Sequence, residues 1–215
     1  MSSPLADPDG RVPPGPVLLC VAHPGHELRV HGWLGLSRPV VCVLTDGSGR
    51  SGEPRLGVTR ALVEGAGAAA GPVFGRLRDD EAYAALLDRR PDVFVDIMEG
   101  LSGLIRDAGI VSVVGDAAEG YNPMHDVCRM IINATVASAR RQGRDISSYE
   151  FSLVGAPDEA REGTDQGAVR LRLDDTRFAA KLAAARDYAE LAEDVEEALL
   201  RHGAVSYTHL RAHET

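Results

Sequence analysis

The stretch CVAHPGHE, residues 20–27, directly continues the apolar run at 17–21. A continuous apolar run of this length predicts a buried strand. Such strands ordinarily end in small or turn-forming residues, because an unpaired polar group is costly to bury. Two imidazoles and a carboxylate at that point therefore suggest a function. Neutral imidazole is the commonest metal ligand among side chains, so His23 and His26 are candidate ligands of one ion.

Outward from this stretch, short apolar runs alternate with helical patterns along the chain. Strands are expected at 17–22, 39–45, 73–77, 110–114 and 148–154, with an edge strand at 168–173. Helices are expected at 27–36, 56–70, 91–108, 124–141 and 176–201, and a further helix is expected to begin at 79–81. Strands that alternate with helices imply parallel pairing. The expected fold class is therefore α/β, a Rossmann-like three-layer sandwich with a mostly parallel sheet.

Composition limits the classes of function. The 215 residues suit one ordinary domain, expected over 17–203, and the net charge of −9 argues against nucleic acid as a partner. No run approaches the roughly 20 apolar residues of a membrane helix, so no membrane insertion is expected. The proline-rich residues 1–16 carry no secretory pattern and predict a flexible arm.

The three cysteines, Cys20, Cys42 and Cys128, show no CxxC spacing. Cys20 and Cys42 lie inside apolar runs, where a free cysteine behaves as a small hydrophobic residue. A reduced, cytoplasmic setting fits this count better than a disulfide framework does. The sequence gives no information on the oligomeric state.

Residues 204–215 are expected to be non-native. The stretch VSYTHLRAHET, residues 205–215, resembles a peptide that arises when sequencing-adapter DNA is translated as part of a gene. The native domain is then expected to be truncated near Gly203. His209 and His213 are excluded from the candidate site for this reason.

A third candidate ligand follows a later strand. A catalytic zinc site usually has three protein ligands and an open position for water. His125 lies at a helix start after the strand at 110–114, and ligands in parallel sheets bind beyond the carboxyl ends of the strands. Any one of these histidines is ordinarily a solvated loop residue. As a set at one edge of the sheet, His23, His26 and His125 predict a Zn²⁺ site.

At this point the chain resembles the LmbE-like (PIG-L) family of zinc-dependent N-deacetylases. The family motif Ala-His-Pro-Asp-Asp-Glu is matched in position by residues 22–27, and its Thr-Asp-Gly by residues 45–47. Its helix arginine with a run of small residues is matched by Arg60 and 66–71. The context Gly-Tyr-His-Pro-x-His is matched by residues 120–125. The resemblance covers about residues 17–155 and implies zinc bound at the carboxyl edge of a Rossmann-like sheet.

The chain departs from the family motif at two positions. In the family the first Asp is the general base and the second is a zinc ligand; here these positions hold Gly25 and His26. Histidine can replace a carboxylate on zinc. Glycine cannot take a proton, and general base catalysis contributes typically 10²–10⁴-fold. Alternative proton acceptors are the acidic residues Glu27, Asp46, Asp116, Glu119 and Asp126.

Further candidate site residues lie near these motifs. Glu27 and Asp126 are candidate catalytic or orienting carboxylates, with Asp126 expected to orient His23 or His125. Tyr121 is a candidate donor to an oxyanion. Arg60, Asp46 and Asn122 are candidate substrate contacts.

The expected function is zinc-dependent hydrolysis of an N-acetyl group on a sugar or sugar-like conjugate, a small-molecule glycoconjugate substrate. The alternative is a metal- or ligand-binding protein of the same fold that lost hydrolysis with its base. If the scaffold is only impaired, Gly25→Asp should raise amidase activity.

Overall fold

The computed structural model describes residues 13, 15–49, 51–154, 169–202 and 207–212. Seven strands form one sheet in the order β3-β2-β1-β4-β5-β7-β6. The first five pair in parallel, whereas β7 is antiparallel to both β5 and β6. The strands are β1 (Val17–Val21), β2 (Val40–Thr45), β3 (Ala69–Leu77), β4 (Ser112–Asp116), β5 (Ser147–Phe151), β6 (Val169–Arg172) and β7 (Tyr207–Ala212). The predicted mostly parallel α/β sheet is confirmed.

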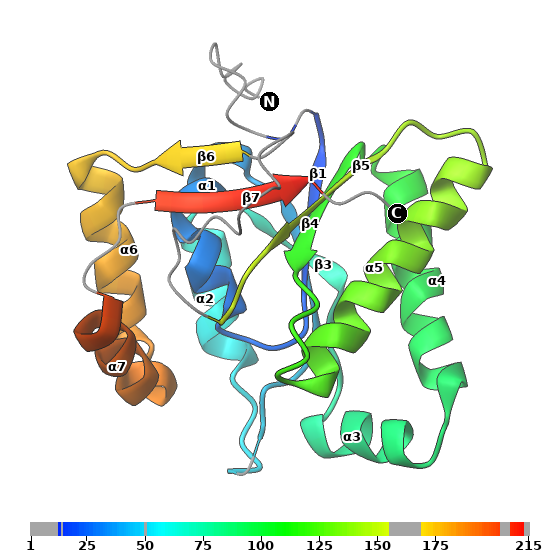
Figure 1. The fold of residues 1–215 in the computed structure, drawn as a ribbon, viewed down its shortest axis with the longest axis horizontal. Helices are drawn as coiled ribbons and strands as arrows, with labels where there is room; N and C mark the ends of the chain where they lie inside the picture. Colours follow the sequence, from blue (N-terminus) through cyan, green and yellow to red (C-terminus); the bar gives the residue numbers. More distant parts are fainter. Residues whose placement is uncertain (1–12, 14, 50, 155–168, 203–206, 213–215) are drawn as a thin grey trace.

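Helices cover both faces of this sheet, which gives the predicted three layers (Figure 1). The helical elements are η1 (His26–Val30), α1 (His31–Ser37), α2 (Leu56–Gly65), α3 (Asp79–Leu87), α4 (Pro91–Asp107), α5 (Pro123–Arg141), α6 (Asp175–Asp187), η2 (Ala189–Leu191) and α7 (Ala192–His202). Helices α4 and α5 pack their apolar faces on the side of the sheet that carries Leu18 and Cys20. The other side carries Leu19 and packs against η1, α1 and α2.

Two helix predictions were too long. The helix predicted over 56–70 ends at Gly65, and Ala69 and Ala70 already belong to β3, where they pair with β2. The alanine-rich composition there favours a helix, but pairing with a buried neighbouring strand overrides it. The helix predicted over 176–201 is divided by Tyr188, whose φ of −82° and ψ of 81° are not helical. Its residues form α6, η2 and α7.

The segment expected to be foreign takes part in the sheet. Residues 207–212 form β7, and Leu210 is buried in the apolar cluster under α1. The origin of this segment stays a prediction, but its residues have a place in this fold. Of the predicted N-terminal arm, residues 1–12 and 14 lie outside the described part of the chain.

Cys20, Cys42 and Cys128 are buried and free, as expected of small apolar side chains. Among the described residues, none of the helices has both the length and the apolar character that crossing a bilayer would require.

Candidate functional site

The carboxyl ends of three neighbouring strands form the floor of the site. Because β1 pairs in parallel with both β2 and β4, their last residues meet at one edge of the sheet. Two hydrogen bonds join the loops that follow. The Thr45 amide donates to the Ala22 carbonyl at 3.0 Å, and the Ala22 amide donates to the Asp116 carboxylate at 2.8 Å. The motif loop is therefore fixed from both sides.

The three histidines singled out in the sequence lie together at this edge. The ring centroid of His23 is 5.4 Å from those of both His26 and His125, and the centroids of His26 and His125 are 4.6 Å apart. His23 and His125 are buried, and His26 is half-buried. Segments far apart in the sequence thus bring these imidazoles into contact, while their role as metal ligands stays a prediction.

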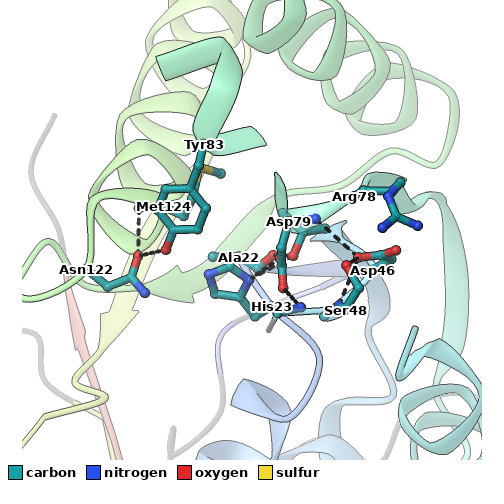
Figure 2. Close-up of polar contacts among 12 residues, drawn as sticks. Ala22, His23, Asp46, Ser48, Arg78, Asp79, Tyr83, Asn122 and Met124 are labelled. Atoms are coloured by element: carbon teal, nitrogen blue, oxygen red, sulfur yellow. Dashed lines mark hydrogen bonds and ion pairs between the residues drawn. The ribbon is translucent and has the colours of Figure 1, made fainter. Parts of the chain in front are cut away.

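His23 is held by partners from two other segments. Its Nδ1 lies 2.8 Å from Thr45 Oγ1 and 3.0 Å from Asp79 Oδ1. A carboxylate oxygen only accepts, so the proton between His23 and Asp79 belongs to His23 Nδ1. Burial opposes ionisation of Asp79, but its hydrogen bonds with His23 and Thr45 outweigh burial and hold its pKa well below the ordinary value. Figure 2 shows His23 beside Asp79, with Asp46 and Ser48 beyond it.

Burial disfavours the charged form of His125, the third imidazole of the cluster. Burial, with a smaller contribution from the neighbouring His26, lowers the pKa of His125 to about 4. It is therefore neutral near pH 7, the form that binds a metal ion. Four buried polar atoms of this region lack a hydrogen-bond partner among the described residues: His23 Nε2, Glu27 Oε1, Asp116 Oδ1 and His125 Nδ1.

The imidazoles are gathered without yet surrounding a common point. The rings meet edge to face, with interplanar angles of 64–85°. No group of three or more His, Cys, Asp or Glu side chains within the described part of the chain stands ready to hold a metal ion. The donor types suit zinc, but their present orientation is not that of a completed metal centre.

Gly25 has a conformation and surroundings that suit glycine alone. Its φ is +103°, a region that side chains rarely adopt. A Cβ at this position would lie 2.4 Å from Leu191 Cδ1, so η2 occupies the space above the motif. The expected gain of activity with Gly25→Asp therefore meets a steric obstacle, because the carboxylate has no room unless Leu191 moves.

Glu27 lies beneath the motif loop and is fully buried. Its Oε2 accepts a hydrogen bond from the Gly25 amide at 2.8 Å, and burial raises its pKa. Nearby, Thr59 Oγ1 and the Tyr188 hydroxyl are 3.0 Å apart. Burial, together with the charge of Glu27, raises the pKa of Tyr188 to about 12. Glu27 therefore braces the loop from inside, and Tyr188 is a phenol at neutral pH.

Two of the remaining candidate acids organise loops. Asp46 Oδ1 accepts hydrogen bonds from the amide and hydroxyl of Ser48 at 2.9 and 2.7 Å. Asp126 Oδ1 accepts from the amides of Glu119 and Gly120 at 2.9 and 3.1 Å. The expected contact of Asp126 with a histidine is not among its hydrogen bonds within the described part of the chain.

The candidate substrate contacts lie at different depths. Asn122 caps α5 through its Oδ1, which accepts from the Met124 amide and the Tyr83 hydroxyl (Figure 2). Tyr121 is 75% exposed and so lies on the surface of its loop. Arg60 lies on the surface of α2, 4.6 Å above the Phe74 ring and 3.7 Å from Glu64. It has no hydrogen bond to the motif loop among the described contacts.

Sequence reasoning missed several residues of this region. Asp79 looked like an ordinary helix-start acid, although it binds His23. Arg55, in the same segment as Arg60, donates from Nε to the Gly47 carbonyl at 2.6 Å. Arg129 is 1% exposed. It follows His125 by one helical turn, and this spacing could have placed it on the inner face of α5.

Comparison of the sequence with protein-family models and with curated proteins finds no match. Solved structures share the fold. The structure of the A40926 pseudoaglycone deacetylase Dbv21 is similar with a TM-score of 0.62 at 18% identity, over 92% of this chain and 96% of that one. The zinc-inhibited form of teicoplanin deacetylase Orf2 is similar with a TM-score of 0.64 at 13% identity, over 94% of this chain and 99% of that one. The conserved protein TT1542 from Thermus thermophilus is similar with a TM-score of 0.61 at 14% identity, over 91% of this chain and 93% of that one.

Proposed function

We propose that the chain is an LmbE-like zinc-dependent hydrolase that removes an acetyl group from the nitrogen of a sugar or sugar-like conjugate. The observation that carries this proposal is the cluster of His23, His26 and His125 at the carboxyl edge of the sheet. Burying imidazoles with unpaired nitrogens has little structural benefit, because each unpaired polar group costs free energy. A ligand that uses those nitrogens offsets this cost.

Zinc is the ion that this donor set favours. Three imidazoles leave a tetrahedral ion one open position, the usual arrangement of a catalytic zinc site. His23, His26 and His125 would hold the ion after their rings reorient, since the present arrangement does not converge. When bound, zinc would polarise an amide carbonyl and supply an acidified water.

The structural relatives support a substrate class. A second teicoplanin-pathway deacetylase structure with this fold is a complex with teicoplanin, at a TM-score of 0.61 and 15% identity. An N-acetylated small-molecule glycoconjugate is therefore the substrate class that we propose. In the chain itself, the Tyr83 hydroxyl of α3 donates to Asn122, the residue before α5, and Figure 2 shows this pair to one side of His23; we propose it as a sugar contact.

Gly25 favours a second candidate function, metal or ligand binding without hydrolysis. The space of a motif side chain is taken by Leu191, and Glu27 has no exposed surface from which to take a proton from water. The two functions differ in one respect only, whether a carboxylate at this edge accepts the proton of the attacking water.

The test combines metal content with an assay of acetate release from N-acetylglucosamine conjugates. We expect about one zinc per chain, lost in His23→Ala and His125→Ala. The matched control is His31→Ala, since His31 lies in α1 outside the three-imidazole cluster. Zinc with acetate release supports the hydrolase, and zinc without release supports the binding protein. A wild-type chain that takes up no zinc from a micromolar solution would contradict both.

A further inference from the structure

Asp116 is the acidic residue that contacts the motif most closely. It ends β4 with no exposed surface, and its Oδ2 makes two contacts with the motif loop. It accepts from the Ala22 amide at 2.8 Å and lies 2.9 Å from Nδ1 of His26. The sequence indicated this residue only as one of five alternative proton acceptors, because a separation of 90 residues between Asp116 and His26 hides the contact.

The contact decides which nitrogen of His26 carries the proton. A carboxylate oxygen only accepts, so Nδ1 must donate, and the lone pair is then left on Nε2. This is the tautomer that binds a metal through Nε2, and such ligands commonly donate their other N–H to a carboxylate. Nδ1 of His23 has an equivalent carboxylate partner in Asp79, whereas Nδ1 of His125 has no hydrogen-bond partner among the described residues.

The backbone of Asp116 is itself anchored. The buried guanidinium of Arg129 donates to the Asp116 carbonyl at 2.6 Å and to the Gly115 carbonyl at 2.8 Å. A Cβ on Gly115 would lie 2.3 Å from the Cys20 carbonyl oxygen, so glycine lets β4 approach β1 closely at this point. These contacts hold the carboxylate against the motif loop.

We propose that Asp116 is a positioning residue that fixes the tautomer and ring orientation of His26 for metal binding. It also places a carboxylate beside the imidazoles. The proposal rests on the proposed function for the metal itself, but the tautomer is a property of the metal-free protein. Carboxylates in this role ordinarily contribute 10–100-fold to metal affinity.

Two measurements test it. In the metal-free protein, long-range ¹H–¹⁵N NMR of the imidazoles should show His26 protonated on Nδ1, and Asp116→Ala should shift it toward Nε2 protonation. In Zn²⁺ titrations, Asp116→Ala should bind roughly 10–100-fold more weakly. Asp116→Asn keeps an acceptor for both donors and removes only the charge, so it should lie between. If the alanine variant does not fold, the Zn²⁺ affinity of the asparagine variant decides.

The matched control is Glu150→Gln. Glu150 is also a carboxylate, is nearly as buried, and lies opposite Gly115 on β5, but it forms ion pairs with Arg129 and Arg211. The substitution should leave both the His26 tautomer and Zn²⁺ affinity unchanged. An unchanged tautomer in Asp116→Ala, with a Zn²⁺ affinity within about twofold of wild type in both variants, would overturn the proposal, because a positioning carboxylate contributes more than that. If the wild-type chain binds no zinc but Asp116→Ala still shifts the His26 tautomer, only the proposed function is overturned.

Discussion

The five parallel strands and the C-terminal segment 169–202 are built on different principles. The central strands β1, β2 and β4 are almost completely buried and pair along their whole length. Helix α6, in contrast, has no buried residue. The segment joins the sheet through the pairing of β6 with β7, and Leu171 and Leu173 are buried in the apolar cluster under α1. Leu173 fills the space at Gly32, Leu191 the space at Gly25, and the Tyr188 hydroxyl meets Thr59. The sheet thus fixes the imidazoles, whereas the C-terminal segment controls the space above them.

The difference teaches where substitutions should act. Among the parallel strands, one buried side chain can hydrogen-bond several backbone groups, so its loss should reduce the free energy of unfolding of the whole domain. In the C-terminal half, single contacts between a side chain and a glycine or a hydroxyl should have smaller and separable effects.

The largest effect is expected from Arg129→Met, which tests the parallel half. It removes the side-chain donor to the carbonyls of Gly115, Asp116 and Tyr149 and one of the two ion-pair partners of buried Glu150. We expect a loss of roughly 3–5 kcal/mol in the free energy of unfolding, measured by urea denaturation. Arg140→Met on the same helix is the control and should cost far less. A loss below about 1 kcal/mol for Arg129→Met would remove its assigned role.

Gly25→Ala tests how tightly the C-terminal segment closes on the motif. Positive φ and the contact with Leu191 should together cost roughly 2–4 kcal/mol. Gly52→Ala is the control, because Gly52 has φ +77° and no atom within 4 Å of an added Cβ. Thermal or urea unfolding of Gly25→Ala/Leu191→Ala should show that part of the loss is recovered. Strict additivity of the two substitutions would show that Leu191 does not fill this space.

Lys181 predicts a pH dependence within the C-terminal segment. Burial, helped by the charge of Arg29, lowers the pKa of Lys181 to about 8 from the ordinary 10.5. Between these values the unfolded chain binds more protons, so stability rises with pH, by at most roughly 1.4 kcal/mol per unit. Below about pH 8 both states are protonated and the cost of burying the charge is complete. Urea unfolding from about pH 7 to about pH 9.5 should show the rise in wild type and its absence in Lys181→Met.

The smallest effect is expected from Tyr188→Phe. It removes the hydroxyl that meets Thr59 but keeps the buried ring, so we expect a loss of about 1 kcal/mol in unfolding free energy. Adding Thr59→Val should cost little more, since the pair is then already broken. Tyr121→Phe, at a largely exposed ring, is the control. An equal effect of both tyrosine substitutions would contradict the buried contact.

The sequence predicted the part of the fold that is coded locally. The apolar runs at 17–22 and 39–45 indicate buried strands directly, and the strand-end histidines follow from them. The pairs Asp116–His26 and Asp79–His23 could not be predicted, because each depends on a long-range contact that no spacing reveals. Alanines 69 and 70 were predicted as helix because local propensity ignores the neighbouring strand. The closure of Leu191 over Gly25 likewise has no local signal.

The fit of Leu191 over Gly25 also constrains how this sequence can change. A carboxylate at position 25 is disfavoured while leucine stands at 191, and a smaller residue at 191 opens a void while glycine stands at 25. Substitution in either order therefore passes through a less stable protein, so the fitness effect of each position depends on the other. A library that varies both positions together should reach combinations that stepwise selection does not.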